Sequence, residues 1–247
     1  MKVVHIKNDN FTFKEKLCVC IGYFDGIHLG HKALIDTTVD YAHNNSLKSA
    51  LISFEPDPIE VITKKKNYHI FSSKKRKEII SSLGIDYLII IDFNEELMRM
   101  NPEEFIDKYL KKLNIQHLVC GYDFRFAYKA KGNPNLLRKY FKTDIIPEYK
   151  YYGKKVSSSR IKDTIYKGNF KLVNRLLGFN YEINLKVKKV QKMASKWLLE
   201  AKIADKDIFI PKEGEYKGYF SIKNDTFYLE SSDKHSINDT VTIVFYE

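Results

Sequence analysis

The sequence predicts an α/β protein, with a doubly wound parallel sheet in its larger part and a small β-barrel-like domain after it. In the larger part, short apolar runs alternate with segments of helical apolar spacing, which is the pattern of βαβ units. The later part contains only short alternating segments, which are typical of antiparallel strands. We therefore expect a first domain over residues 1–183 and a small β domain over residues 184–247.

The composition is that of a folded protein with a sizeable core. The chain has 247 residues, 44% of them hydrophobic, and it contains 16 Phe and 17 Tyr. This excludes a disordered chain and allows one large and one small domain. The three cysteines, Cys18, Cys20 and Cys120, cannot all pair and lie in apolar runs, so we expect reduced core residues of a cytoplasmic protein.

Neither a membrane segment nor a nucleic-acid surface is expected. No apolar run approaches the ~20 residues of a membrane helix, and we expect no signal peptide. The net charge is +11, with basic runs at 64–66 and 74–77. We interpret these runs as a solvated surface that also attracts polyanionic nucleotides, and we expect no nucleic-acid partner. The sequence does not indicate an oligomeric state.

The first elements follow from the apolar runs and the residues that end them. Leu17–Ile21 is apolar throughout and is expected to be a buried strand, followed by a helix from about Lys32 to Asn44. Ser49–Phe54 is the second expected strand, and the proline-rich Glu55–Pro58 ends it. Ser72–Leu83 is expected to form a helix that a serine caps.

Capping signals place the later elements of the first domain. Asn101, Pro102 and Glu104 supply a cap, an N1 proline and an acidic first turn for a helix over Phe105–Leu113. The other expected strands are Tyr87–Ile91, His117–Cys120 and Asp144–Ile146, and the other helices are Ser157–Tyr166 and Phe170–Leu177. In the small domain we expect strands in Ile183–Val190, Trp197–Ala201, Tyr216–Ile222, Thr226–Leu229 and Val241–Tyr246.

Residues 22–31 read Gly-Tyr-Phe-Asp-Gly-Ile-His-Leu-Gly-His and lie in the turn between the first strand and the first helix. Ligands of open α/β sheets bind beyond the carboxyl ends of the strands, and a helix N-terminus there presents N–H groups to phosphate. Gly26 and Gly30 let the backbone turn sharply and approach a ligand. His28 and His31 can hydrogen-bond phosphate oxygens and stabilise charge that develops during phosphoryl transfer.

These ten residues resemble the Gly-x-Phe-Asp-Gly-x-His-x-Gly-His signature of the bacterial FAD synthetases, in the Rossmann-like nucleotidylyltransferase superfamily. The resemblance implies an FMN adenylyltransferase, which transfers AMP from MgATP to the phosphate of FMN and releases FAD and pyrophosphate. Mg²⁺ would arrive with ATP, FMN would be the substrate and FAD the product. The resemblance also implies a catalytic role for two residues, His28 and His31. The same two residues would bind ATP together with Gly22, Phe24, Asp25 and Gly26.

Two further segments are similar to family motifs that contact the flavin. Phe54-Glu55-Pro56-Asp57-Pro58 is similar to Phe-x-Pro-x-Pro, and many relatives have histidine where this chain has Asp57. Asp57 would either face a metal ion or point outward. Residues 121–126 are similar to Gly-x-Asp-Phe-x-Phe-Gly, whose last glycine is Ala127 here, a change that would stiffen the loop. The flavin-binding residues that the resemblance implies are Phe54, Pro56, Pro58, Asp123, Phe124 and Arg125. Of Phe124 and Phe126, at least one is expected to pack inward.

The last motif lies at the start of an expected helix. Residues 156–162 read Val-Ser-Ser-Ser-Arg-Ile-Lys and are similar to the family's Ile-Ser-Ser-Thr-x-Ile-Arg. Hydroxyls and N–H groups at a helix N-terminus bind phosphate, and a cation on the first turn compensates its charge. The implied ATP-binding residues are Ser158, Ser159, Arg160 and Lys162. Lys162 replaces the usual arginine and lacks its planar fork. The sequence does not indicate which residues would bind a metal ion.

The resemblance covers residues 15 to about 183, and relatives usually carry a riboflavin kinase barrel after this module. Residues 210–216 resemble part of that barrel, but the kinase's Gly-x-Pro-Thr-Ala-Asn loop is missing from residues 194–210, and the segment is shorter. We expect a degenerate kinase-like domain without riboflavin kinase activity. Two alternatives stay open. The chain could be a nucleotidylyltransferase with another phosphorylated acceptor, or a weakened regulator that binds flavin or nucleic acid.

Overall fold

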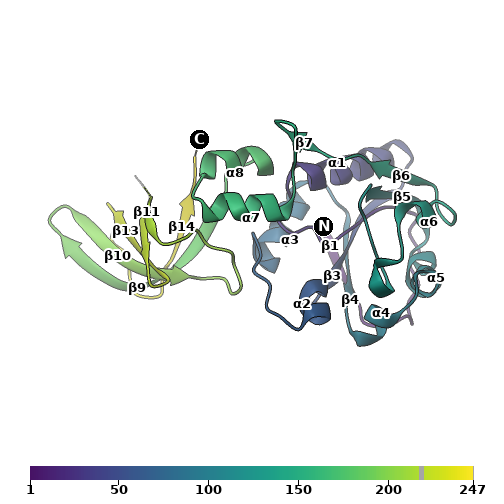
Figure 1. Cartoon of the computed structure of the whole chain (residues 1–247), viewed down its shortest axis with the longest axis horizontal. Helices are drawn as coiled ribbons and strands as arrows, with labels where there is room; N and C mark the ends of the chain where they lie inside the picture. Colours follow the sequence, from purple (N-terminus) through teal and green to yellow (C-terminus); the bar gives the residue numbers. More distant parts are fainter. Residues whose placement is uncertain (217–219, 247) are drawn as a thin grey trace. The chain divides into compact units, whose positions relative to one another are not determined.

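The structure, a computed structural model, describes residues 1–216 and 220–246 (Figure 1). The chain forms two compact units. The first contains Met1–Asn67 and Ser73–Val156, and the second contains Tyr68–Ser72 and Ser157–Glu247. Each unit has its own six-stranded sheet, so the mixed architecture predicted from the sequence is confirmed.

The sheet of the first unit is parallel throughout, in the order β1-β4-β3-β2-β5-β6. Its strands are β1 (Lys2–Ile6), β2 (Leu17–Ile21), β3 (Lys48–Glu55), β4 (Tyr87–Asp92), β5 (Ile115–Gly121) and β6 (Thr143–Ile146). From β2 the chain adds β3 and β4 toward one edge, and it then returns to place β5 and β6 on the other side of β2. The topological switch point, where open sheets bind ligands, therefore lies between β2 and β5.

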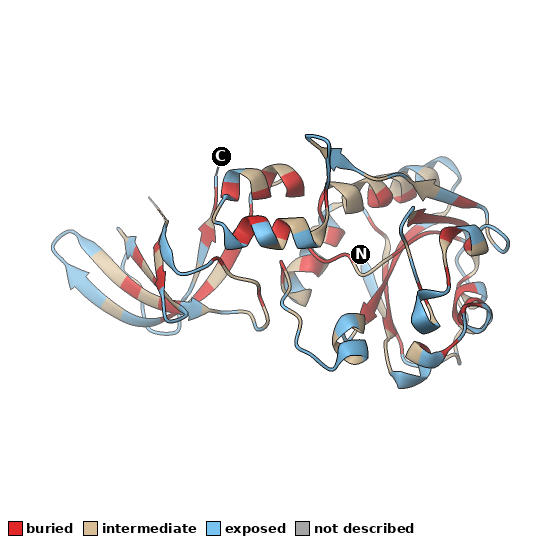
Figure 2. Cartoon of the chain, in the orientation of Figure 1, coloured by how far each residue is buried: buried red, intermediate tan, exposed pale blue. Residues whose placement is uncertain are grey.

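Helices cover both faces of this sheet, and the strands are buried between them (Figure 2). α1 (Leu29–Asn44) and α3 (Ser73–Ser82) pack on one face, against a core that includes Cys18 and Leu51. The opposite core includes Val19 and Ile52 and is covered by the following elements: α4 (Glu95–Arg99), α5 (Pro102–Phe105), the π-helical turn Ile106–Leu110, the 3-10 turn Lys111–Leu113 and α6 (Pro134–Leu137). A strand buried on both faces is apolar at every position, as β2 is.

Most expected elements are found near their predicted bounds, with two informative differences. β1 was not expected, because this edge strand is mostly exposed and carries a weak apolar signal. α1 begins at Leu29 rather than near Lys32, which puts His31 in its first turn. The cap at Asn101 and the N1 proline are as predicted, and Asn101 and Glu104 form a capping box. The helix expected over Phe105–Leu113 differs, because the α-helix covers Pro102–Phe105 and continues as the π-helical and 3-10 turns.

The second unit combines two helices with an antiparallel sheet in the order β11-β12-β13-β10-β9-β14. The elements are α7 (Ser158–Tyr166), α8 (Phe170–Leu177), β9 (Glu182–Met193), β10 (Lys196–Ile203), β11 (Gly214–Tyr216), β12 (Phe220–Lys223), β13 (Thr226–Ser231) and β14 (Thr240–Val244). The single strand predicted over 216–222 is wrong, because Tyr216 on β11 pairs antiparallel with Phe220 on β12, and residues 217–219 lie outside the described residues.

α8 belongs with this sheet because it shares a core with it. The ring of Phe170 stacks on that of Phe245, with centroids 3.8 Å apart. The buried Asn174 donates to the carbonyl of Phe245 (2.6 Å) and accepts from the backbone N–H of Tyr181 (2.7 Å). These contacts group α7 and α8 with the second sheet, whereas the sequence pattern alone suggests a boundary between residues 183 and 184.

The cysteines are core residues, as expected. Cys18, Cys20 and Cys120 are free and buried. Burial raises the pKa of Cys18 and Cys20 to about 12 and that of Cys120 to about 11, so these thiols are inert at neutral pH. Among the described residues, no helix is long and apolar enough to span a membrane.

Candidate active site

The turn that follows β2, residues 22–31, is called the histidine loop here. It folds tightly because Phe24, Gly26 and Ile27 all have left-handed backbone angles (φ 58°, 86° and 43°). Only Gly26 adopts such a φ without cost, so the two apolar residues store strain that their burial must offset. Strained residues of this kind concentrate at functional sites.

His28 is the N-cap of α1. Its Nδ1 accepts a hydrogen bond from the backbone N–H of His31 (3.2 Å). The two imidazole rings stack, with centroids 3.7 Å apart and planes 10° apart. Because Nδ1 is an acceptor, a neutral His28 carries its proton on Nε2, an assignment that rests on the hydrogen-bond pattern. His28 can therefore both cap the helix and donate a hydrogen bond from Nε2.

Both histidines are neutral at physiological pH. Burial lowers the pKa of His28 to about 4. Burial, and then the neighbouring His28, hold the pKa of His31 well below its usual range. The Nδ1 atom of His31 is buried and has no hydrogen-bond partner within the described part of the chain. A buried polar atom without a partner is costly and is expected where a ligand completes the site.

Gly30 makes the stacking possible. A Cβ atom at this position would lie 3.2 Å from Cε1 of His28 and 3.6 Å from Cβ of Tyr149. A side chain here would therefore push the His28 ring by a few tenths of an ångström, whereas its contact with Tyr149 would be an ordinary one. The group that comes close to Gly30 in the structure is the His28 ring, and the predicted approach of a ligand to this glycine stays a prediction.

Two opposite charges act on His28, one from the segment after β5 and one from β8 (Lys154–Lys155). The carboxylate of Asp123 accepts a hydrogen bond from Nζ of Lys155 at 2.5 Å, and this bond is the main cause of the raised pKa of Lys155. Both groups act electrostatically on the pKa of His28. Lys155 lies on β8, which pairs with β7 (Lys150–Tyr151). Sequence reasoning missed Lys155, because nothing but its place before Val156 distinguishes it in a lysine-rich chain.

Aromatic rings gather at and after the carboxyl ends of β3 and β5. Phe54 is buried against the rings of Phe93 (5.9 Å) and Phe105 (6.4 Å). Phe126 packs inward, as expected of at least one of its pair, and Phe124 stacks on it at 5.6 Å. Arg125, which lies between these two phenylalanines, is exposed and donates a hydrogen bond to the carbonyl of Phe124.

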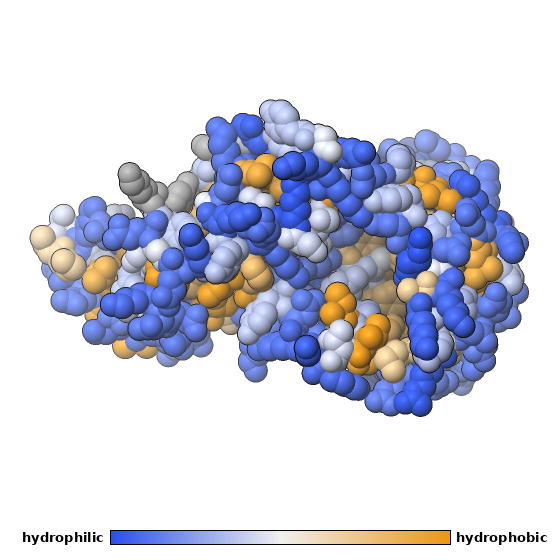
Figure 3. Space-filling model, viewed as in Figure 1, coloured by the Kyte–Doolittle hydropathy of each residue, from blue (hydrophilic) through white to orange (hydrophobic). Residues whose placement is uncertain are grey.

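Asp57 does not point outward. It is buried and caps α2 (Pro58–Thr63), because Oδ1 accepts from the N–H of Ile59 and Oδ2 from Nδ2 of Asn67, both at 2.8 Å. α2 follows the Pro56–Pro58 motif and has no buried residues, so its side chains Ile59 and Ile62 are exposed. Figure 3 shows hydrophobic surface over this part of the first unit. Sequence reasoning missed this apolar helix face.

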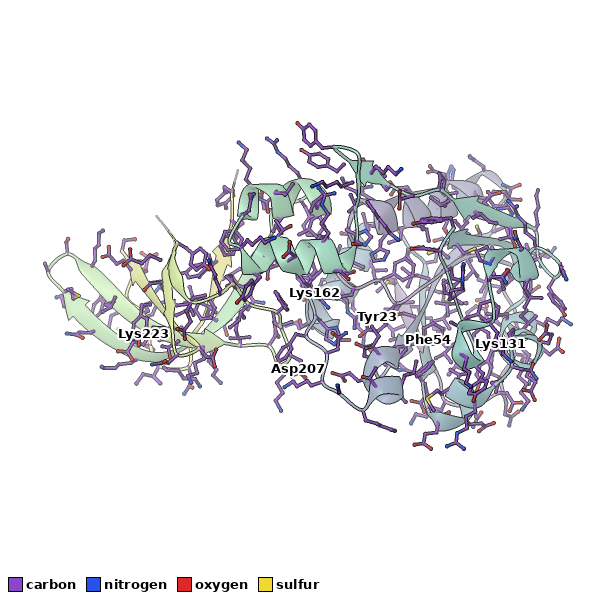
Figure 4. All side chains as sticks on the ribbon, in the orientation of Figure 1. Tyr23, Phe54, Lys131, Lys162, Asp207 and Lys223 are labelled. Carbon is purple, nitrogen blue, oxygen red and sulfur yellow. The ribbon has the colours of Figure 1, made fainter. Side chains whose placement is uncertain are left out.

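The predicted phosphate-binding residues of the last motif lie on the second unit. Ser157 caps α7, and its hydroxyl accepts from the N–H of Arg160 (3.3 Å). The four predicted residues, Ser158, Ser159, Arg160 and Lys162, occupy the first turns of this helix. Figure 4 labels Lys162 on α7, and Tyr23 and Phe54 in the first unit. Among the described residues, no group of three His, Cys, Asp or Glu side chains is placed to hold a metal ion.

Comparisons with known proteins agree with the motifs. The FAD synthetase family model matches residues 11–160. The chain is 34% identical over 192 residues to the bifunctional riboflavin kinase/FMN adenylyltransferase of Bacillus subtilis, covering 74% of this chain and 61% of that protein. It is 29% identical over 229 residues to the bifunctional protein of Listeria monocytogenes, covering 90% of this chain and 73% of the relative.

Two further comparisons concern a FAD synthetase and the fold. The chain is 30% identical over 190 residues to a FAD synthetase of Listeria monocytogenes, covering 74% of this chain and 77% of the relative. A solved macrolide-efflux protein from Streptococcus pneumoniae is 24% identical with a TM-score of 0.84, covering 99% of this chain and 89% of that one, which shows the fold. The family match and these identities establish that the chain belongs to the FAD synthetase family.

Proposed function

We propose that this chain is an FMN adenylyltransferase, which transfers AMP from ATP to the phosphate of FMN and releases FAD and pyrophosphate. The observation that carries the proposal is the stacked, neutral pair His28 and His31 at the N-terminus of α1, beside the switch point of the parallel sheet. Family membership supports the same reaction.

The reaction needs positioning and charge stabilisation more than proton transfer. A phosphate oxygen of FMN, already nucleophilic at neutral pH, forms a bond to the α-phosphorus of ATP while the bond to the bridging oxygen of pyrophosphate breaks. The Nε2–H of His28 and the N-terminus of α1 are suited to hydrogen-bond the triphosphate, where charge increases in the transition state. The histidine loop is shaped by Gly22, Phe24, Asp25 and Gly26.

The acceptor side is proposed to bind the flavin between apolar and polar groups. Pro56 and Pro58, with the exposed residues of α2, are proposed to offer an apolar surface to a flat ring, and the buried Phe54 is proposed to support this surface from the end of β3. Asp123 and Arg125 are the polar residues of this side, with Phe124 between them. Lys155 joins the proposed site, because its charge acts on His28 and suits a polyanionic substrate.

On the second unit, Ser158, Ser159, Arg160 and Lys162 are proposed to bind nucleotide phosphates. Mg²⁺ is proposed to enter with ATP, coordinated by phosphate oxygens and water, as Mg²⁺ usually is in such sites.

The proposal has consequences for partners and organisation. The substrates ATP and FMN are the proposed partners, without nucleic acid, and the proposed location is the cytoplasm. Residues 1–183 are proposed as the adenylyltransferase domain. Residues 184–247 are proposed as a kinase-like domain that has lost activity, because the kinase loop is missing from the sequence.

Chromatography of reaction mixtures tests the proposal against its alternatives. With FMN, ATP and Mg²⁺, the expected products are FAD and pyrophosphate. A relative with a different acceptor would form neither product from FMN, and a regulator would bind flavin without turnover. Riboflavin with ATP should give no FMN under the same conditions, and its appearance would mean that the second sheet retains a kinase site.

A further inference from the structure

α3 buries a charged residue that none of the family motifs includes. Arg76 belongs to α3 and is only 8% exposed. Its Nε atom is buried and has no hydrogen-bond partner in the part of the chain that the structure describes. Burying a guanidinium without full pairing destabilises a fold, so a purely structural position would favour an apolar residue.

Arg76 contacts the histidine loop at Tyr23 in two ways. Its Nη1 donates a hydrogen bond to the backbone carbonyl of Tyr23 (3.2 Å). Its guanidinium carbon lies 4.8 Å from the centroid of the Tyr23 ring, in cation–π geometry. The hydroxyl of Ser53 donates to the same carbonyl, also at 3.2 Å. Two donors from different elements therefore fix one peptide group of the loop.

That peptide group controls the strained part of the loop. A peptide unit is planar and trans, so fixing the carbonyl of Tyr23 also fixes the direction of the N–H of Phe24. Phe24 is the first left-handed residue of the loop (φ 58°), and its ring lies 5.1 Å from that of His31. A shift of the Tyr23 carbonyl would therefore be transmitted through Phe24 to the histidine pair.

We propose that Arg76 is a positioning residue for the nucleotide-binding half of the site: it holds the Tyr23 carbonyl and so keeps Phe24 and His31 in their binding geometry. This inference rests on the proposed function, because the loop is taken to bind ATP. Arg76 does not itself touch the substrate. This role predicts that substituting Arg76 weakens the binding of ATP and leaves the binding of FMN unchanged.

The cavity beside Arg76 supplies a sharp test. Tyr23, Ser53 and Arg76 line a space of about 270 Å³ that includes open solvent. In Arg76→Ala, added guanidinium ion can enter the vacated position and donate to the Tyr23 carbonyl. Urea has a similar shape without the charge and is the matched additive. Lys74→Met removes one positive charge from an exposed position of the same helix and is the matched variant.

The expected result for Arg76→Ala is a kcat for FAD formation lowered about tenfold to a hundredfold, the loss expected for a misplaced catalytic group. The KM for ATP should rise, while the KM for FMN should stay within about twofold of the wild-type value. Millimolar guanidinium, but not urea, should restore turnover. Lys74→Met should match wild type. A folded Arg76→Ala protein with wild-type ATP parameters would overturn the inference, and so would an equal loss toward both substrates that guanidinium does not reverse.

Two further measurements keep the test decisive. If Arg76→Ala does not fold, Arg76→Lys keeps the charge while losing the planar fork, and it should show the same selective weakening toward ATP. ATP binding by calorimetry does not depend on which acceptor the enzyme uses. If wild type binds ATP but forms no FAD, the proposed function fails, while weaker ATP binding by the Arg76 variants would still support the positioning role.

Discussion

The imidazole rings of His28 and His31 are stacked 3.7 Å apart, and the helix start that they share is held by a hydrogen bond from the N–H of His31 to Nδ1 of His28. Burial keeps both rings neutral. The pair is therefore built to offer hydrogen-bond donors to an anion rather than a permanent positive charge, and a bound phosphate would favour protonation of these rings.

Replacing either histidine by alanine should lower FAD formation about 10²–10³-fold, because one preorganised donor is lost. His43→Ala is the control, since His43 is exposed near the end of the same helix. Steady-state kinetics measure the effect, and circular dichroism checks the fold. Near-wild-type turnover in a folded His28→Ala protein would contradict the assignment.

The lowered pKa of His28 makes the folded state sensitive to acid. An unfolded histidine titrates near pH 6.5, whereas His28 in the folded chain titrates at about 4. Between these values the unfolded chain binds more protons, so the free energy of unfolding falls as the pH is lowered through this window. His28→Asn keeps an N-cap side chain but removes the titration.

Urea unfolding between pH 7 and pH 4 should therefore show a shallower pH dependence for His28→Asn than for wild type. Equal slopes in the two proteins would show that His28 titrates normally in the folded chain.

Ala127 occupies a conformation that suits glycine. Its backbone angles are φ 62° and ψ −173°, a region in which a Cβ atom costs roughly 1–3 kcal/mol. Ala127→Gly removes this strain but also increases the entropy of the unfolded chain, which costs less than the strain. The free energy of unfolding should therefore rise by about 1 kcal/mol and Tm by roughly 2–4 °C. The same change at Ala33, within α1, should lower Tm instead. If Ala127→Gly also lowers Tm, the loop is not strained at this residue.

Lys162 should contribute charge to ATP binding without the geometry of arginine. Lys162→Arg is expected to retain or lower the KM for ATP, because a guanidinium can pair with two phosphate oxygens at once. Lys162→Ala should raise this KM several-fold, and Lys167→Ala, in an exposed pair with Asp163 just beyond the same helix, is the matched control. Unchanged ATP kinetics in Lys162→Ala would leave Arg160 as the cation of this motif.

Local patterns in the sequence were sufficient for the architecture of the first unit. The apolar run Leu17–Ile21 predicts a strand buried on both faces, and Asn101, Pro102 and Glu104 predict a helix start, because these signals depend on near neighbours. The same holds for the histidine loop, whose residues are contiguous. An exposed edge strand such as β1 has no comparable local signal.

Contacts between distant residues were decided only by the tertiary structure. Asp57 is a buried cap because Asn67 folds back onto it, and Lys155 meets Asp123 across 32 positions of sequence. α8 joins the second sheet through its contact with Phe245.

The sequence by itself determined the family, the parallel sheet and the residues of the motifs, since these are carried by periodicity and contiguous residues. The tertiary structure decided the protonation of His28 and His31 and the contact of Arg76 with Tyr23. The physical reason is that burial and electrostatic fields sum over residues that the folded chain brings together, and no local pattern encodes that sum.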